Sequence, residues 1–474
     1  MKNPMPMWLA GIEKRASGTL AVTDKWTGQE MASVHLADEM LLKEAIAGAT
    51  DAEGAMRKMS GAQRADALRT IADELGARSE EFARIIMQEA GKPIRAARAE
   101  VLRAIGTFRI AAGEATRIGG EYMRLDSIGA NAGMEAVSMR VPVGACSFVT
   151  PFNFPLNLVA HKVAPAIACG CTFVLKPAPA TPVSALMLGE ILAKLGMPRG
   201  AFSVVPCRNE DAHVLVEDER VKLLSFTGSA EVGWKVKRDA GKKRVVLELG
   251  GNAACVVDEG VEVEKVADRI VAGAFTQAGQ SCISVQRVLI HGSNYEAMRT
   301  ALVRKTKGLF SADAEDERTT VGPMISEAAA RRVEDWVKGA VSAGGTLLCG
   351  GERTGAFHTA SIVENVPHTC LLWSEEAFGP VMAIEKFTDF SEAMQVVNDS
   401  HYGLQAGVFT NRLDHAMRAW KGLEVGAVVL NDVPSTRADE MPYGGVKDSG
   451  IGREGVRSAI RDMTEERLLV MRNG

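Results

Sequence analysis

KLLSFTGSAEVGWKVKRDAGKKRVVLELGG, residues 222–251, alternates between two kinds of pattern. A short apolar run at residues 222–226 leads into a segment with helical spacing, and a second apolar run follows at residues 245–249. Short apolar runs that alternate with helical segments predict parallel strands joined by crossover helices. The same pattern occurs earlier in the chain, with apolar runs at residues 143–149, 172–175 and 202–205. We therefore predict an α/β fold built on a doubly wound parallel sheet.

The length of the chain and the two glycines that end this stretch indicate at least two domains. A chain of 474 residues exceeds the size at which a single core keeps growing. Gly250 and Gly251 are predicted to mark a crossover into a second α/β region that runs to about residue 445. Residues 40–118 carry apolar side chains at helical spacing, and residues 119–142 contain two alternating runs that predict a protruding hairpin.

Composition and charge exclude several classes of protein. The chain carries 55 basic and 59 acidic side chains, and this balance gives no reason to expect nucleic acid or an anionic membrane as a partner. No run of about 18 apolar residues predicts a membrane span, and the first residues lack the pattern of a signal peptide. Eight cysteines are too few for a disulfide scaffold, and the spacing of Cys169 and Cys171 is not that of zinc ligands. We expect a cytoplasmic protein without a metal.

Cys282 lies in the run FTQAGQSCISVQR, residues 275–287, and differs in its surroundings from the other cysteines. Most of the other seven stand in apolar runs, which suits a packing role. Cys282 is flanked by Gly279, Gln280 and Ser281, and small polar neighbours are what a thiol needs if a substrate must reach it. The local context therefore leaves two interpretations open, a reactive nucleophile or a small buried side chain.

Other polar residues stand at the ends of predicted strands, where parallel sheets bind their ligands. Asn153 offers an amide to an oxyanion, although an ordinary Asx turn would also explain it. Gly228 and Ser229 suit a pyrophosphate at a helix N-terminus, although helix capping favours the same residues. Lys176 either holds a ribose hydroxyl or is a solvated charge. Glu248 ends an apolar strand, where a carboxylate needs either a charged partner or a role in proton transfer.

Taken together, these residues resemble the aldehyde dehydrogenase superfamily. The matching segments follow that family's order over nearly the whole chain and comprise residues 151–155, Lys176 and residues 226–229, 248–252, 279–282 and 376–380. The resemblance implies a Rossmann-type NAD(P)-binding domain at residues 1–118 and 143–249, and an α/β catalytic domain at residues 250–445. It also implies oligomerisation elements at residues 119–142 and 446–474, and thus a homodimer or homotetramer.

The resemblance further implies an enzyme of the hydrolytic type, which oxidises an aldehyde to a carboxylic acid while NAD(P) is reduced. In such an enzyme Cys282 is the nucleophile and forms a thiohemiacetal and then a thioester. Asn153 and the Cys282 backbone N–H form the oxyanion hole, and Glu248 activates the water that releases the acid. The residues expected to contact the cofactor are Thr150, Pro151, Phe152, Lys176, Pro179, Gly228, Ser229, Gly250, Glu376 and Phe378.

Three positions depart from the family's common pattern. Pro179 stands where a glutamate often binds the adenosine ribose hydroxyls, so a 2′-phosphate meets less repulsion and NADP is expected to serve as well as NAD. Phe152 replaces a common tryptophan and Asn252 replaces a common lysine. Neither of these two replacements touches the expected mechanism.

The expected substrate pocket contains polar and charged residues. His161, Arg109 and Arg437 are predicted to surround an anionic or strongly polar aldehyde tail, with a structural hydrogen bond or a surface charge as the alternative for each. Ser281 and Ile283 flank the nucleophile. Ser281 stands where some anion-binding members have arginine, which weighs against a phosphorylated substrate.

Two alternatives stay open beside the hydrolytic enzyme. A CoA-acylating or reductive relative would not need Glu248 as a base for water. A catalytically silent oligomeric binding protein could keep the fold, but it would not need Cys282, Asn153 and Glu248 together. The sequence does not identify the aldehyde, the preference between NAD and NADP, or the number of subunits.

Overall fold

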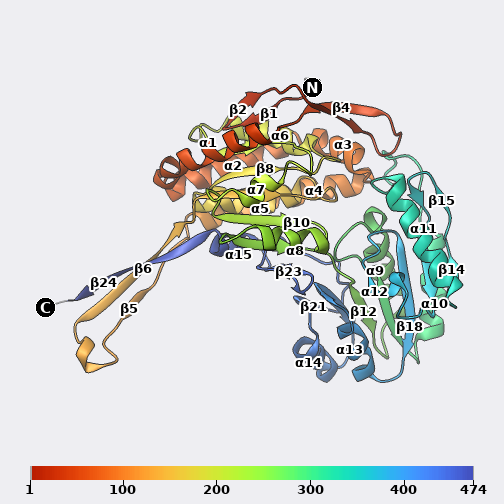
Figure 1. The fold of residues 1–474 in the computed structure, drawn as a ribbon. Helices are drawn as coiled ribbons and strands as arrows, with labels where there is room; N and C mark the ends of the chain where they lie inside the picture. The colour runs from red at the N-terminus through yellow and green to blue at the C-terminus, as the bar shows by residue number, and fades with distance from the viewer. Residues whose placement is uncertain (1–2, 473–474) are drawn as a thin grey trace.

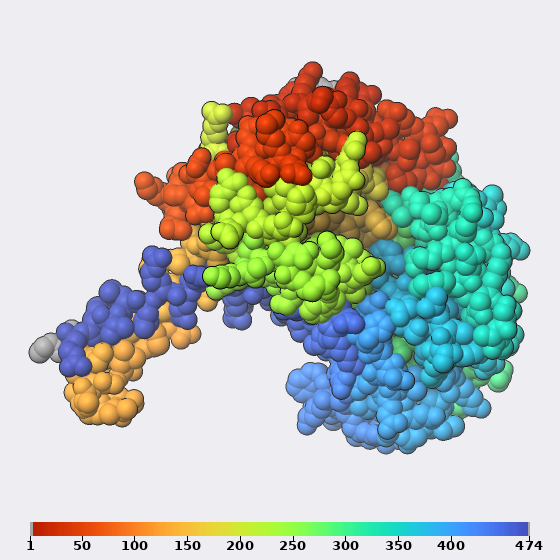
Figure 2. All heavy atoms as spheres, viewed as in Figure 1, coloured from red at the N-terminus to blue at the C-terminus, as the bar shows by residue number. Residues whose placement is uncertain are grey.

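The protein consists of two α/β bodies and one protruding arm, as a computed structural model that describes residues 3–472 shows (Figure 1). The first body contains the N-terminal part of the chain up to β11 and a short return near the C-terminus. The second body follows it and ends near residue 445. The arm extends from the first body away from the second (Figures 1 and 2).

The first body is built on an eight-stranded sheet in the order β2-β1-β9-β8-β7-β10-β11-β23. Its five central strands are parallel and lie where the apolar runs predict them: β7 (Ala145–Val149), β8 (Thr172–Lys176), β9 (Phe202–Val204), β10 (Leu223–Thr227) and β11 (Arg244–Glu248). The predicted doubly wound parallel sheet is therefore confirmed. The outer, antiparallel strands of the sheet were not predicted, because they are only two or three residues long: β1 (Met7–Leu9), β2 (Ile12–Lys14) and β23 (Gly450–Ile451).

Helices with apolar stripes cover this sheet and form its main core. They are α1 (Glu39–Lys58), α2 (Gly61–Ala77), α3 (Ser79–Ala90), α4 (Ile94–Ala115), α5 (Asn157–Cys169), α6 (Val183–Ala193), α7 (His213–Glu217), α8 (Ala230–Asp239) and α15 (Val456–Asp462). The helical lead-in predicted for residues 40–118 is thus confirmed. A hairpin of β3 (Thr19–Thr23) and β4 (Glu30–His35) precedes it.

The second body has a seven-stranded sheet in the order β14-β17-β18-β13-β12-β20-β21 and a core of its own. Its strands are β12 (Ala254–Val257), β13 (Arg287–His291), β14 (Thr346–Cys349), β17 (Ser361–Glu364), β18 (Val381–Phe387), β20 (Gln405–Phe409) and β21 (Ala427–Leu430). Its helices are α9 (Val263–Phe275), α10 (Tyr295–Lys307), α11 (Glu327–Ser342), α12 (Leu371–Ser374), α13 (Phe390–Asn398) and α14 (Leu413–Gly422). Short pairs complete it: β15 (Arg353–Thr354) with β16 (Phe357–His358), and β19 (Tyr402–Gly403) with β22 (Val446–Lys447).

The arm is a three-stranded antiparallel sheet in the order β24-β6-β5. The hairpin predicted at residues 119–142 supplies β5 (Tyr122–Arg124) and β6 (Met134–Pro142), and the final strand β24 (Thr464–Arg472) pairs with β6 along its whole length. The predicted boundary at residue 446 assigns too much of the C-terminal segment to the arm. Residues 450–451 pair with β11 and α15 packs on α5, so the chain returns to the first body before it enters the arm.

Two further properties of the chain bear on its class. Within residues 3–472, no helix is both long and apolar enough to cross a membrane. All eight cysteines are free thiols. Cys169 and Cys171 form no disulfide, although the Cys169 thiol donates a hydrogen bond to the Cys171 sulfur at 3.6 Å.

Candidate active site

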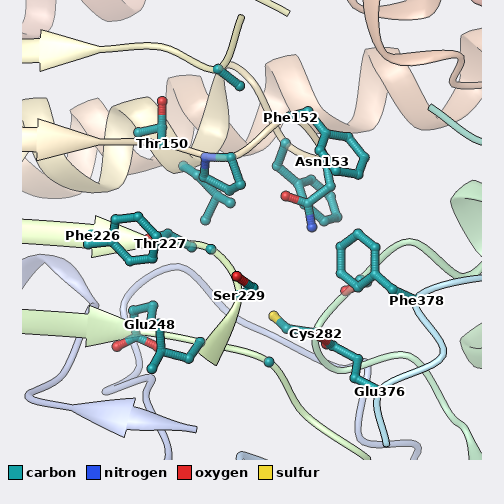
Figure 3. A pocket seen from close by; sticks show the side chains of 18 of the residues that line it. Thr150, Phe152, Asn153, Phe226, Thr227, Ser229, Glu248, Cys282, Glu376 and Phe378 are labelled. Atoms are coloured by element: carbon teal, nitrogen blue, oxygen red, sulfur yellow. The ribbon is translucent and has the colours of Figure 1, made fainter. Parts of the chain in front are cut away.

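One cavity of about 1330 Å³ lies between the first sheet and the second body. Its walls include the carboxyl ends of β7, β8, β10 and β11, the first turn of α8 and the loop that follows α9. Parallel sheets offer ligands this edge because helix N-termini and strand ends meet there. Cys282, Asn153 and Glu248, the three residues predicted to be catalytic, all line this cavity (Figure 3).

A strained turn presents Cys282 to the cavity. The 3₁₀ turn η2 (Thr276–Gly279) contains three consecutive residues with positive φ, namely Gln277 at 56°, Ala278 at 53° and Gly279 at 67°. Non-glycine residues in this conformation are costly, and such strain is typical of functional sites. At Gly279 a side chain would also collide with the second body, because a Cβ would lie 2.1 Å from the carbonyl oxygen of Gly379. The turn leaves Cys282 half-buried, with its sulfur pointing into the pocket (Figure 3).

Among the residues that the structure describes, the Cys282 thiol has one hydrogen-bond partner. Its Sγ lies 2.9 Å from the hydroxyl oxygen of Tyr443. Burial raises the pKa of the thiol to about 12, although the bond to Tyr443 acts in the opposite direction. The resting thiol is therefore protonated at neutral pH and must lose its proton before it can act as a nucleophile.

Asn153 is anchored beside the nucleophile. Its side-chain Nδ2 donates to the carbonyl oxygen of Gln280 at 3.1 Å, and the Gln277 amide donates to the backbone carbonyl of Asn153. An amide nitrogen has two hydrogens, so the second one is free to bind an oxygen in the cavity. Asn153 is thus held at the cavity wall with one amide hydrogen available.

Glu248 ends β11 and is buried next to a second carboxylate. Its Oε1 accepts from the backbone N–H of Glu454 at 3.3 Å, and burial together with the charge of Glu454 raises its pKa well above the usual value. Glu454 itself is neutralised by Lys162 at 3.0 Å and Arg437 at 3.1 Å, and these cations help to hold its pKa at about 2. Of the two carboxyl groups, Glu248 is therefore the one that holds a proton more readily.

Comparison with known proteins agrees with this arrangement. The sequence profile described as "Aldehyde dehydrogenase family" matches residues 12–469. The 3-sulfolactaldehyde dehydrogenase of Priestia aryabhattai is 42% identical over 466 residues, which cover 98% of this chain and 97% of that protein.

Two solved structures share the whole fold. Aldehyde dehydrogenase 21 from Physcomitrella patens, in complex with the reaction product succinate, superposes with a TM-score of 0.98 at 48% identity and covers 100% of this chain and 99% of its own. The NADP-dependent glyceraldehyde-3-phosphate dehydrogenase from Bacillus halodurans, complexed with NADP, reaches 0.96 at 32% identity and covers 100% of both chains. The chain belongs to the aldehyde dehydrogenase family. The predicted family, fold class and enzyme class, an NAD(P)-dependent aldehyde dehydrogenase, are thereby confirmed.

The cavity of this aldehyde dehydrogenase fits a nicotinamide dinucleotide. All ten residues predicted to contact the cofactor line it. Ser229 is the N-cap of α8, and its hydroxyl makes no capping hydrogen bond, so both the helix N-terminus and the hydroxyl can receive a phosphate. Lys176 is buried at the end of β8, where its Nζ donates to Asn209 Oδ1 at 3.0 Å and burial lowers its pKa.

Glu376 and Phe378 close the other side of this cofactor region. Glu376 Oε1 accepts from the backbone N–H of Gly251 at 3.0 Å, and burial raises the pKa of its carboxyl group to about 7. Gly250 leaves room for this carboxylate, because a Cβ there would lie 2.5 Å from Glu376 Oε2. The Phe378 ring meets the Phe152 ring edge-on, with 5.8 Å between centroids (Figure 3).

The residues predicted to contact the substrate divide into two groups. Ser281, Ile283 and Arg437 line the cavity, but Arg109 and His161 do not. Arg109 stands on the outer face of α4, where its side chain is 64% exposed and lies 3.9 Å from Asp73. Six residues along an α-helix turn a side chain by about 240°, so the arginine of α4 that faces the cavity is Arg103. The prediction for Arg109 is corrected accordingly.

His161 lies behind the cavity wall rather than in it. Its Nε2 is 2.8 Å from Asp439 Oδ1, and burial and nearby Arg437 lower its pKa, so the ring is neutral. A neutral ring donates one hydrogen, here to Asp439. The prediction that His161 contacts the substrate is corrected to a structural hydrogen bond, which was the stated alternative.

Four residues of the site escaped the sequence analysis. Tyr443 touches the nucleophile, Glu454 sets the charge beside Glu248, and Arg103 forms a two-point ion pair with Asp439, at 2.7 and 3.2 Å. The local signal for Tyr443 and Asp439 is a loop between β21 and β22 that is rich in charged and turn-forming residues, RADEMPYGG at 437–445, whereas Arg103 lies in α4 and Glu454 follows β23. Spacing alone could not show which other segments this loop meets.

Proposed function

We propose that this aldehyde dehydrogenase oxidises a small aldehyde with an anionic or strongly polar tail, with Cys282 as its nucleophile. The observation that carries the proposal is the convergence of the Cys282 sulfur, the Asn153 amide and the Glu248 carboxyl group on one cavity that also holds every predicted cofactor residue. A screen of aldehydes with NAD and NADP, followed by the absorbance of the reduced cofactor, tests it. Turnover with neutral aldehydes alone would contradict the proposed substrate class.

The reaction follows from the positions of these groups. The Cys282 thiolate attacks the carbonyl carbon, and the Asn153 amide with the Cys282 backbone N–H stabilises the negative oxygen of the thiohemiacetal. A nicotinamide dinucleotide held by residues such as Lys176, Ser229 and Glu376 would supply the acceptor for the hydride that this adduct loses when it becomes a thioester. Glu248 then takes a proton from a water molecule, and the resulting attack on the thioester releases the acid and regenerates the thiol.

The burial of Glu248 favours hydrolysis over transfer of the acyl group to CoA. Burying a carboxyl group in this environment costs free energy, and its raised pKa makes the carboxylate a stronger base than an exposed glutamate. A CoA-acylating relative would gain nothing from this base, and a silent binding protein would gain nothing from the whole set.

Arg437 supports an anionic tail. One of its nitrogens holds Glu454, but its buried Nε has no hydrogen-bond partner among the described residues. Arg437 lines the cavity, and a guanidinium at a cavity wall is suited to a carboxylate or sulfonate oxygen. The similar proteins also point to an anionic substrate, since one relative is named for sulfolactaldehyde and one structural neighbour holds succinate.

Removing the charge of Arg437 is expected to discriminate between substrates. In Arg437→Gln, the KM for an aldehyde with an acidic tail should rise about tenfold more than the KM for a neutral aldehyde of equal length. The ratio of the two KM values is the measurement, because effects on the nucleophile are common to both substrates. Arg109→Gln is the matched control and should leave the ratio unchanged. Equal changes in both KM values would remove Arg437 from substrate recognition.

Pro179 supports the use of NADP beside NAD. It lines the cavity near Lys176 and offers no carboxylate to repel a 2′-phosphate. We place the enzyme in the cytoplasm, because eight free thiols fit a reducing compartment.

The arm supports a homodimer or homotetramer. Its edge strand β24 exposes consecutive apolar side chains, with Leu468 at 49%, Leu469 at 61% and Val470 at 47%, and Met139 of β6 is exposed beside them. A narrow sheet with apolar residues on both faces and an unpaired edge is unstable in water and suits a second copy of the chain.

A charge on this strand is therefore expected to dissociate the oligomer. Leu469→Glu should shift the mass measured by light scattering towards that of the 50.6 kDa chain, and Leu413→Glu, at an exposed residue of α14, serves as the comparison. An unchanged mass in Leu469→Glu would show that subunits do not meet through the arm.

A further inference from the structure

We infer that the Tyr443 hydroxyl is a catalytic hydrogen-bond donor that stabilises the thiolate of Cys282 once the thiol has lost its proton, an inference that rests on the proposed role of Cys282 as nucleophile. The two residues are 161 positions apart in the sequence, and their side-chain atoms lie 2.9 Å from each other. Tyr443 is fully enclosed, and its loop connects the second body to the returning C-terminal segment. No other side chain hydrogen-bonds to this sulfur within residues 3–472.

When Cys282 is a thiolate, the phenol must be the donor of this hydrogen bond. Burial raises the pKa of Tyr443 well above its usual value, and the neighbouring Cys282 raises it further. The phenol is therefore neutral and always has a hydrogen to donate, whereas a thiolate can only accept. A bond that strengthens when the thiol loses its proton favours the thiolate.

The remaining charges around the sulfur make this donor necessary. Glu248 of β11 and Glu376, which follows α12, are carboxyl groups that disfavour a thiolate, and burial disfavours it more. Arg437 opposes them from the loop that carries Tyr443. Among the groups that favour the thiolate, Tyr443 has the larger effect and is the one in direct contact with the sulfur.

Tyr443 is held rigidly in this position. Its backbone exchanges two hydrogen bonds with Glu454, at 3.0 and 2.7 Å. The Arg437 guanidinium lies 3.7 Å from the centre of the ring, a distance at which a cation is attracted to the aromatic face. Glu454 also binds Arg437. Tyr443 is therefore fixed both through its backbone and through the face of its ring.

A second contact fastens the same loop to the first body. Asp439 accepts hydrogen bonds from Arg103 of α4 and from Asn157 and His161 of α5, with Oδ1 at 2.7, 3.2 and 2.8 Å from their nitrogens. His161 and Asp439 are therefore positioning residues: they hold the loop, and the loop holds the phenol against the sulfur.

Alkylation of Cys282 by iodoacetamide in the full-length enzyme tests the donor. The rate is measured against pH for the peptide that contains Cys282, without aldehyde present. In Tyr443→Phe the midpoint of the profile should rise by about one pH unit, and the rate at pH 7 should fall about tenfold. Tyr295→Phe removes the hydroxyl of another buried tyrosine, which bonds Glu364 at 3.2 Å, and should leave the profile unchanged.

The pH profile of alkylation distinguishes the effect of the Tyr443 hydroxyl from the effect of ring packing. If Tyr443→Phe keeps the wild-type midpoint while Tyr443→Leu does not, the ring matters and the hydroxyl does not, and the inference is overturned. The burst of reduced cofactor in Tyr443→Phe should approach the wild-type rate as pH rises, which a distorted pocket would not allow. A failure of the proposed function would appear elsewhere, as turnover that survives Cys282→Ala.

Discussion

Cys282→Ala is expected to lower the formation of reduced cofactor by at least about 10⁴-fold with every aldehyde tested. The alanine keeps the turn at residues 276–279 but removes the atom to which the aldehyde must be joined before hydride can leave. Asn153 and the cofactor residues cannot compensate, because they stabilise an adduct that no longer forms. Initial rates with NAD and with NADP measure the loss.

Cys370→Ala provides the matched control for this prediction. Cys370 is the other cysteine that is not fully buried, and it lies outside the cavity at the start of α12. Its removal should leave the rate unchanged and show that loss of an accessible thiol is not harmful in general. Residual turnover in Cys282→Ala near the wild-type level would overturn the assignment of the nucleophile. Unaltered thermal unfolding of both variants excludes misfolding as the cause.

The fold could be predicted where local patterns coincide with buried elements. The central strands of the first sheet are buried on both faces, so each is a continuous apolar run that is visible in the sequence. Strands β1, β2 and β23 are short strands that join the sheet through pairing with distant segments, and no local pattern reveals them. The return of residues 450–462 to the first body was missed for the same reason.

The site could be predicted where a residue ends a strand or belongs to a motif of the family. Asn153 follows β7 and Glu248 ends β11, so the topology of the sheet brings them to the same edge. Tyr443 could not be placed, because its contact with Cys282 joins two loops that are 161 residues apart in the sequence. Arg109 was predicted to bind the substrate from its residue type alone, whereas the orientation of α4 decides that Arg103 faces the cavity.

Glu248→Ala is expected to separate the two halves of the reaction. Acylation does not need this carboxylate, so a first equivalent of reduced cofactor should still appear in a burst. Hydrolysis of the thioester needs a base for water, so steady turnover should fall by about 10²- to 10⁴-fold. Stopped-flow absorbance measures both phases in one experiment, with the burst amplitude compared with the concentration of active sites.

The pH dependence adds a second test of the same residue. Burial and the charge of Glu454 raise the pKa of Glu248, and the base is the deprotonated form. Steady turnover of the wild-type enzyme should therefore rise with pH as Glu248 loses its proton, and this rise should be absent in Glu248→Gln, which keeps the size of the side chain. Loss of the burst in Glu248→Gln would instead assign Glu248 to acylation. Faster steady turnover of the wild-type enzyme when CoA is added would favour the acylating alternative, because CoA would then replace the water that Glu248 activates.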